Sequence, residues 1–338
     1  VTSALFLLVF LVIWTTLVGV MASHFLGGIV KNLLATQWPT ATGMVVECDI
    51  EVGRTEDGET YGVSVRYEYE VDGKTYEGTL RRFGAEKADD DFAENWVAAH
   101  PPGTAVTVYH NPAAPREAIL EPGLAGYDLF LVLFMTPFAA VAVGGLVYVM
   151  SAGLRKIRGG AAKPVQIVQR GWRLGVKLPT TPPSAKAGIA VAVAAFVMIF
   201  IIGFTAGFHP PLWGMTLVWG GILIFGLGLY LRERLRTSLG MYDLGLREES
   251  GQIVLPITDD RQTTETFPID RVEKAWIRFR QSTNADGDQD HQHIAMLVVQ
   301  DAHHCGRRHR HVIHEFAKAE PAEALVDFVN TWLDDQRG

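Results

Sequence analysis

The stretch LRKIRGGAAKPVQIVQRGWRLGVKLPTTPPSAK, residues 154–186, decides the fold because it lies between two apolar blocks of membrane-spanning length. In a chain whose net charge is −7, it holds no acidic side chain and eight basic ones: Arg155, Lys156, Arg158, Lys163, Arg170, Arg173, Lys177 and Lys186. Short loops rich in Lys and Arg stay on the cytoplasmic side of a membrane. We therefore expect this loop to be cytoplasmic. The side of the membrane on which every other segment lies then follows from the order of the spans.

Four apolar blocks are long enough to cross a bilayer, whose hydrocarbon core needs roughly 20 helical residues. They cover about residues 4–29, 127–150, 187–208 and 213–231. The first block is longer than a typical signal-peptide core and no clean small-residue cleavage site follows it, so we expect a retained span. A second basic flank, residues 232–236, follows the last block. Because basic flanks bracket the last two blocks, the tip of that helical hairpin is expected outside.

The spans contain no Asp, Glu, Lys or Arg between their ends. Carriers and pumps usually place ionisable groups at mid-membrane, so this composition argues against ion-coupled transport. Pro137 predicts a kink in the second span. The glycines of the fourth span favour close helix contact, either within the chain or with a partner's helix: Gly220, Gly221, Gly226 and Gly228.

Residues 39–122 form an acidic polar block with the pattern of a β domain. Residues 63–71 alternate between apolar and polar side chains, which is typical of a half-buried strand. Asp72-Gly73 is the dipeptide of a two-residue hairpin turn, and the returning strand is expected over 74–80. Other elements are predicted as strands over 44–52, 106–109 and 118–120 and as a helix over 85–99.

The turn and strand signals of this block carry a family resemblance. They are Trp38-Pro39-Thr40…Gly43, then Tyr67-x-Tyr69-x-Val71-Asp72-Gly73-Lys74-x-Tyr76-x-Gly78, then Pro102-Gly103…Val106-x-Val108-Tyr109-His110-Asn111-Pro112…Pro115…Ala118-x-Leu120-Glu121-Pro122. Over about residues 36–123, with the flanking spans, the chain resembles the bacterial membrane-protein family catalogued as domain of unknown function 3592. The resemblance implies a small β-rich domain held between two transmembrane helices, and it implies no reaction.

Residues 240–338 form a second polar block with six predicted strands and a closing helix. The strands are expected over 241–246, 253–256, 264–268, 270–280, 291–300 and 308–316. The helix, over 321–333, is amphipathic, with one apolar face made of Ala322, Leu325, Val326, Val329, Trp332 and Leu333. This order of elements resembles a pleckstrin-homology-like (PH-like) barrel, and a resemblance of element order assigns no ligand.

Seven of the eleven histidines lie between residues 291 and 314. A His-x-His pair on a strand places both rings on one face, which is a workable start for binding Zn²⁺, Ni²⁺ or Cu²⁺. The candidate metal ligands are His291, His293, His303, His304, Cys305, His309 and His311. The alternative is a set of solvated strand and turn residues, because interleaved arginines repel a dication: Arg307, Arg308 and Arg310.

Charge and motifs exclude several classes of protein. The net charge of −7, without a basic patch in either polar block, argues against nucleic-acid binding. Cys48 and Cys305 are the only cysteines, and we expect them on opposite sides of the membrane, so no disulfide framework is predicted. Asp89–Asp91 fit a solvated helix start and lack the spacing of an EF-hand. With no Walker loop, Gly-x-Ser-x-Gly, kinase or Rossmann motif, the sequence predicts no enzyme.

These patterns predict a multi-pass α-helical membrane protein with four transmembrane helices, a small extracytoplasmic β-rich domain and a cytoplasmic α+β domain built as a PH-like barrel with a C-terminal helix. We expect it in the bacterial cytoplasmic (inner) membrane, with the lipid bilayer and other membrane-protein subunits as partners. The expected segments are helix 1 and its exit (1–38), the extracytoplasmic domain (39–123), helix 2 (124–151), the basic cytoplasmic loop (152–186), the hairpin of helices 3 and 4 (187–231) and the cytoplasmic domain (232–338).

The predicted function is that of a non-enzymatic accessory or scaffold protein that binds or stabilises a larger bacterial membrane complex. The β domain, the glycine-bearing helices and the C-terminal domain each offer a contact surface, and no cofactor is required. The alternative is a membrane sensor whose histidine-rich cytoplasmic domain responds to metal. A partner that co-purifies at fixed stoichiometry favours the first function, and stoichiometric metal favours the second.

Overall fold

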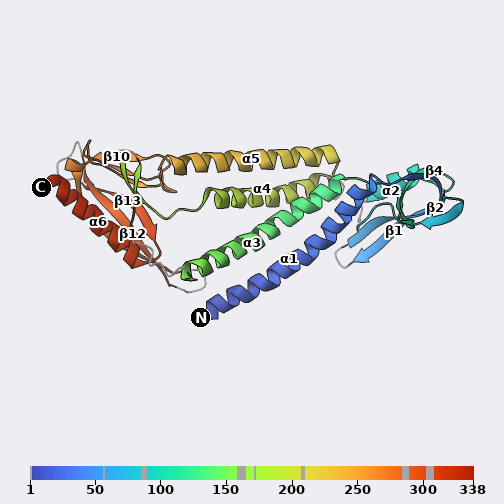
Figure 1. Ribbon diagram of the computed structural model, residues 1–338, viewed down its shortest axis with the longest axis horizontal. Coiled ribbons are helices and arrows are strands. Elements are labelled where there is room, and N and C mark those ends of the chain that lie inside the picture. The colour runs from blue at the N-terminus through green and yellow to red at the C-terminus, as the bar shows by residue number, and fades with distance from the viewer. Residues whose placement is uncertain are drawn as a thin grey trace. The chain divides into compact units, whose positions relative to one another are not determined.

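The chain divides into two compact units in a computed structural model. Unit 1 is Val1–Met150 with Ala187–Leu227, and unit 2 is Ser151–Lys186 with Gly228–Gly338. Figure 1 follows the chain through both units by colour. The structure describes residues 2–55, 58–84, 90–157, 165–170, 173–206, 210–283, 289–301 and 308–338.

Four long helices correspond to the four predicted spans. They are α1 (Thr2–Ala35), α3 (Gly126–Ile157), α4 (Pro183–Ala206) and α5 (Leu212–Ser238). All four are long and apolar enough to cross a membrane. Large apolar side chains point away from the protein along them, among them Phe6 (75 % exposed) and Phe204 (88 % exposed). Such faces suit a lipid environment, and the chain fits a membrane protein with β-rich regions.

Two glycines allow close contacts between helices. A Cβ at Gly226 would lie 2.5 Å from a methyl of Val191, so α5 meets α4 closely at this position. A Cβ at Gly145 of α3 would lie 2.2 Å from Leu11 of α1. A Cβ would meet no atom within 4 Å at the other three glycines predicted to make close contacts: Gly220, Gly221 and Gly228. The expected contact within the chain is therefore made by Gly226.

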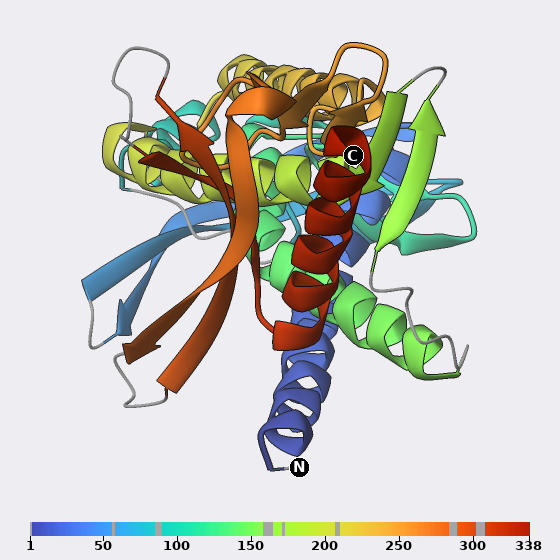
Figure 2. The ribbon, with the colours of Figure 1, turned by 90° about the vertical axis from the view of Figure 1, so that its left-hand side faces the viewer.

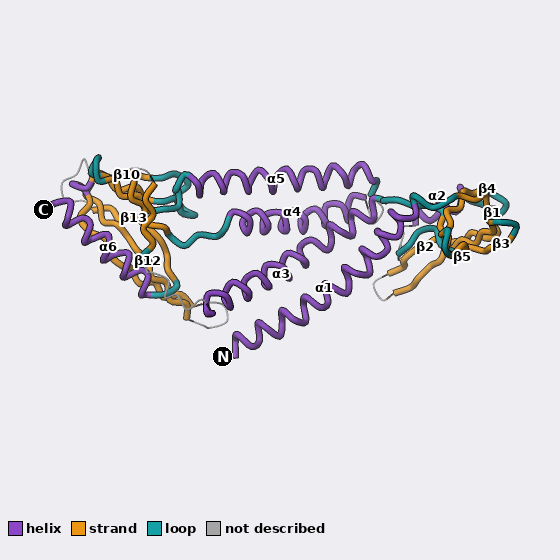
Figure 3. The backbone as a smooth tube through the Cα atoms, viewed as in Figure 1, coloured by secondary structure: helices purple, strands orange, loops and turns teal. Residues whose placement is uncertain are grey.

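The β domain of unit 1 is a five-stranded antiparallel sheet in the order β3-β2-β1-β4-β5, with one helix (Figure 3). Asp72 (φ +52°) and Gly73 (φ +73°) both lie in the left-handed region, which confirms the predicted two-residue turn between β2 and β3. The elements are β1 (Thr40–Thr55), β2 (Gly58–Val71), β3 (Lys74–Gly78), α2 (Asp90–Ala99), β4 (Ala105–Asn111) and β5 (Ala114–Ile119).

Tyr67 forms the centre of this domain's core. Its side chain is fully buried, and its hydroxyl lies 3.0 Å from the carbonyl oxygens of both Leu80 and Ala118, which share its one proton. Burial raises the pKa of the Tyr67 phenol, and this shared hydrogen bond gives its buried O–H a partner. Gly78 on the neighbouring strand leaves room for the ring, because a Cβ there would lie 2.4 Å from it. Trp96 of α2 closes the same core.

Unit 2 contains two antiparallel sheets and a closing helix. The first sheet has the order β10-β9-β8-β7-β6, and the second has the order β11-β12-β13. Helix α6 packs against the second sheet, as Figure 2 shows. The elements are β6 (Gln166–Arg170), β7 (Arg173–Lys177), β8 (Leu244–Arg247), β9 (Gln252–Leu255), β10 (Glu265–Pro268), a 3₁₀ turn (Ile269–Arg271), β11 (Val272–Thr283), β12 (Gln289–Gln300), β13 (Arg308–Phe316) and α6 (Ala319–Arg337).

The basic stretch differs from the expected loop. Its residues 166–170 and 173–177 form the paired strands β6 and β7, and β7 also pairs with β8, with Leu174 opposite Leu246. Val176 is only 1 % exposed and belongs to the core of unit 2. The charges of this stretch alone predict a basic loop. Its alternating apolar residues complete the sheet of the C-terminal domain, which therefore includes part of the segment between the second and third spans.

Candidate functional site

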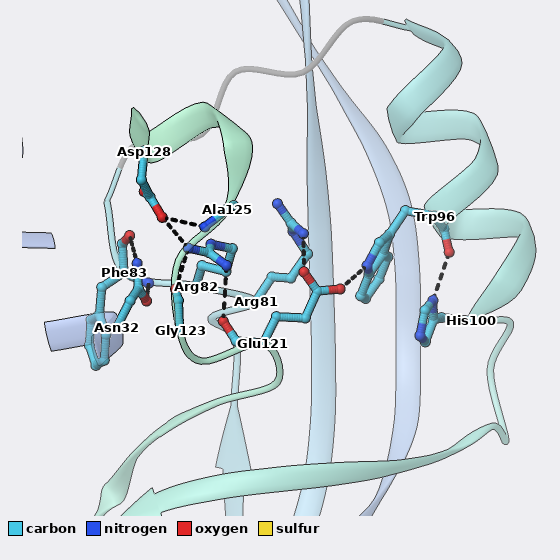
Figure 4. Close-up of polar contacts among 10 residues, drawn as sticks. All are labelled: Asn32, Arg81, Arg82, Phe83, Trp96, His100, Glu121, Gly123, Ala125 and Asp128. Atoms are coloured by element: carbon cyan, nitrogen blue, oxygen red, sulfur yellow. Dashed lines mark hydrogen bonds and ion pairs between the residues drawn. The ribbon is translucent and has the colours of Figure 1, made fainter. Parts of the chain in front are cut away.

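Asn32 fixes the end of α1 to the β domain (Figure 4). Its fully buried amide donates to the carbonyl of Phe83 at 3.1 Å and accepts from the Phe83 N–H at 3.0 Å. Its own carbonyl accepts from the N–H of Gly123 at 2.8 Å. Gly28, one turn earlier, permits this approach, because a Cβ there would lie 3.3 Å from the Phe83 carbonyl oxygen. Asn32 thus holds two segments of the β domain at once.

Arg82 and Asp128 form a buried ion pair between the β domain and the start of α3. Arg82 Nη2 lies 2.6 Å from Asp128 Oδ2, and the two side chains are 7 % and 8 % exposed. The same Arg82 nitrogen donates to the carbonyl of Gly123 at 2.8 Å. Asp128 Oδ2 also accepts from the N–H of Ala125 at 2.8 Å, which caps the first turn of α3. Removing either Arg82 or Asp128 would therefore leave the other charge buried without an ionic partner.

Glu121 connects a second arginine to α2. Its carboxylate accepts from the Arg81 guanidinium through one oxygen and from Trp96 Nε1 at 2.7 Å through the other. Burial lowers the pKa of Arg81, and the Glu121 charge opposes that effect. The guanidinium remains charged and lies 4.9 Å from the ring centroid of Phe92, within cation–π range. His100 stacks on Trp96 at 3.9 Å and completes the group.

We call the five residues that make these contacts the polar junction: Asn32, Arg81, Arg82, Glu121 and Asp128. Its two carboxylates each accept from a guanidinium, so the charges compensate one another. One adjoining cavity, lined in part by His24 and Tyr127, is about 20 Å³, which is space for about one water molecule. A second, lined in part by Arg81 and Arg82, is about 120 Å³. The arrangement is suited to holding the β domain on the ends of α1 and α3. The polar side chains of the junction bond to one another and to the backbone.

The first predicted metal-ligand pair lies near the start of β12. His291 and His293 both contact Phe279 of β11, with ring centroids 5.4 and 5.3 Å apart. Phe279 is 54 % exposed. The expected placement of both rings on one face of a strand is confirmed by this shared contact.

The second pair, His309 and His311, lies on β13. His311 Nδ1 is 3.1 Å from Glu265 Oε2, and His309 Nε2 is 3.5 Å from Asp301 Oδ2. His311 pairs with Leu297 of β12, four residues beyond His293. Four residues of strand span about 13 Å. The register therefore keeps the two pairs apart.

A metal site made of all the candidate ligands stays a prediction. His303, His304 and Cys305 lie outside the described residues. Within the residues that the structure describes, no group of three or more His, Cys, Asp or Glu side chains is arranged to hold a metal ion.

His314 should make the stability of unit 2 depend on pH. Burial lowers its pKa, so the unfolded chain binds this proton more readily. The stabilisation is complete above the unfolded value of about 6.5 and is lost as the pH falls toward the lower folded pKa. We expect thermal unfolding of the full chain to show a smaller loss of stability below about pH 6.5 in His314→Gln than in the wild type. The exposed control His309→Gln should keep the wild-type profile, and an unchanged profile in His314→Gln would contradict the prediction.

Comparison with known proteins identifies the β domain. Residues 41–125 match the family model of a domain of unknown function (DUF3592). This confirms the resemblance drawn from the turn and strand signals. Comparisons with curated proteins and with solved structures found no match. The matched range of the DUF3592 domain includes Arg81, Arg82 and Glu121, so much of the polar junction belongs to it.

Sequence reasoning missed the polar junction. Two local signals were present: Arg81-Arg82 is a basic pair in an acidic block, and Asp128 is an acid at the start of an apolar span. Neither signal names its partner, because Arg82 and Asp128 are 46 residues apart. Asn32 and Phe83 are 51 residues apart. Folding alone brings them together.

Proposed function

We propose that this chain is a non-enzymatic accessory or scaffold protein of a bacterial cytoplasmic membrane, which binds or stabilises a larger membrane complex. In this proposal residues 39–123 lie outside, and residues 152–186 and 232–338 lie in the cytoplasm. The observation that carries the proposal is the polar junction. It fastens the DUF3592 domain to the ends of α1 and α3 through buried bonds, and a domain fixed in this way presents its surface to a partner in one orientation.

The proposed sidedness rests on helix direction and charge. The DUF3592 domain follows the C-terminal end of α1 and precedes the N-terminal end of α3. The basic stretch follows the other end of α3, and Arg232 and Arg236 lie near the C-terminal end of α5. Basic flanks favour the cytoplasmic side. We further propose that unit 2 is PH-like, which its two antiparallel sheets and closing helix support.

The test is purification of the tagged full chain from its native membrane in mild detergent, followed by mass spectrometry. We expect a membrane-protein partner at fixed stoichiometry. Arg82→Gln, which breaks the buried pair, should lose that partner, and Arg66→Gln, which breaks the exposed pair with Glu47, should keep it. The double variant Arg82→Met/Asp128→Leu replaces the pair by apolar contacts. The amount of co-purifying partner should be partly restored in this variant. A chain that elutes alone in the wild type would overturn the proposal.

The sensor alternative is favoured by one observation, the contact of His291 and His293 with the same Phe279 ring. It requires stoichiometric Zn²⁺, Ni²⁺ or Cu²⁺ in the full chain. Equilibrium dialysis followed by metal analysis measures the number of metal ions bound per chain. The double variant His291→Gln/His293→Gln should remove the bound metal. Metal that stays bound in this variant would separate the binding from the His-x-His pair.

A further inference from the structure

A cavity of about 710 Å³ lies within unit 2, and neither the polar junction nor the metal hypothesis uses it. Its size is that of small-molecule binding sites in proteins. Four basic and four acidic side chains line it, so the lining carries no net charge. Charges of both signs around one cavity favour a ligand that also carries both.

The basic part of the wall lies at the ends of two candidate membrane spans. The apolar sequence of α5 ends at Leu231, and Arg232 follows it. The apolar sequence of α4 begins at Ala187, directly after Lys186. Lys186 and Arg232 both line the cavity. Basic residues at span ends lie at the depth of lipid headgroups, so this wall is within reach of a lipid phosphate.

A group of polar contacts fixes this wall. Glu233, whose side chain is 11 % exposed, accepts from Lys186 Nζ at 3.0 Å and from Arg236 Nη1 at 3.3 Å. The Tyr242 hydroxyl donates to the same carboxylate at 2.5 Å. The Glu233 carboxylate thus partly neutralises Lys186 and Arg236 and holds both side chains at the cavity. Arg232 is exposed and has no ion-pair partner within the described part of the chain, so its charge is free for a ligand.

The acidic part of the wall comes from the turn after β9 and from β13. Asp259 and Asp260 lie in the turn, and Glu315 lies on β13; all three line the cavity and are exposed. Arg261 anchors the turn, because its guanidinium donates to the carbonyl of Pro256 at 2.7 and 3.0 Å and to a carbonyl of β13 at 3.0 Å. The acidic groups therefore have a defined place beside the basic ones, which also include Arg280 of β11.

We propose that this cavity binds the headgroup of an ethanolamine phospholipid, with its phosphate at Lys186 and Arg232 and its ammonium at Asp259, Asp260 and Glu315. In such a lipid the phosphate is the charge nearer the acyl chains, which matches a basic wall at the span ends. The ammonium donates up to three hydrogen bonds to carboxylates. A choline headgroup has no N–H to donate. A glycerol headgroup ends in uncharged hydroxyls, so it offers no positive charge to the acidic side.

The test is native mass spectrometry of the full chain released from bilayer nanodiscs. The nanodiscs contain ethanolamine, choline and glycerol phospholipids in equal amounts, with the same acyl chains. We expect about tenfold preferential retention of the ethanolamine lipid over the choline lipid, as for loss of charge-assisted hydrogen bonds. Asp259→Asn/Asp260→Asn should remove this preference, and Arg232→Gln should lower the retention of all three lipids.

Matched controls lie close by and outside the cavity. Arg234→Gln removes an exposed charge from the same helix, and Glu248→Gln/Glu249→Gln removes two exposed charges from the turn after β8; both should behave as the wild type. Soluble phosphoethanolamine should displace the lipid more effectively than inorganic phosphate. Equal displacement by the two, or preference for the glycerol lipid without effect of Asp259→Asn/Asp260→Asn, would overturn the proposal. So would equal retention of all three lipids.

Discussion

Arg82→Gln is expected to destabilise unit 1 by about 3–5 kcal/mol, because it leaves the Asp128 carboxylate buried without its charge partner. One compensating contact remains, the N–H of Ala125 at 2.8 Å. Chemical unfolding of the full chain in detergent measures the change. Tryptophan fluorescence is a suitable signal, since Trp96 lies in the core of the β domain.

Two further variants separate burial from charge. Arg66→Gln breaks a pair of similar length with Glu47 (2.8 Å), but these side chains are 42 % and 59 % exposed. An exposed pair contributes about 0–1 kcal/mol, so this control should unfold nearly as the wild type does. Arg82→Met/Asp128→Leu removes both charges and should recover part of the lost stability. If Arg82→Gln were as stable as Arg66→Gln, the ion pair would not be what holds the β domain on α3.

Local patterns predicted the elements of this protein well. Asp72-Gly73 predicted a turn because both residues tolerate positive φ, and the turn was found. The face of the last helix was predicted from 3.6-residue spacing, and all six residues named for it are buried. The four spans were predicted from length and hydropathy, and helices occupy them. In each case the determining chemistry lies within a few residues of the chain.

The polar junction depends on contacts that no local pattern encodes. Asn32 and Phe83 belong to different elements, and only the closed β domain brings the amide to the peptide group that it pairs with. The sequence shows Arg81 and Arg82 as two basic residues in an acidic block, which alone favours solvent exposure. Their burial is possible because Glu121 and Asp128 arrive from beyond the end of β5.

The basic stretch shows the same limit in another form. Its charges are a sidedness signal, and that signal does not depend on the secondary structure of the stretch. The strands β6 and β7 lie within it, and their apolar positions are few and interspersed with the charges. The many charges therefore made the alternation of apolar and polar side chains hard to recognise. Strand β7, which follows Trp172, was not predicted. Pairing with β8, about 70 residues later in the chain, is what reveals it.

Val176→Asp is the substitution that tests this finding, and it should destabilise unit 2 by more than about 4 kcal/mol. Val176 is 1 % exposed, pairs with Leu244 of β8 and contributes to the core of unit 2. A carboxylate at that position would be buried among the apolar side chains of this core. Thermal unfolding and limited proteolysis of the full chain measure the effect.

The matched control is Ile167→Asp, on the strand directly opposite. Ile167 pairs with Val176 across β6 and β7, but it is 53 % exposed. The same charge is introduced in the same hairpin, so the membrane sidedness of the stretch changes equally in both variants. Only burial in the core differs, and we expect Ile167→Asp to cost less than about 1 kcal/mol. Equal behaviour of the two variants would mean that the stretch is a loop after all, while a large difference assigns β7 to the C-terminal domain.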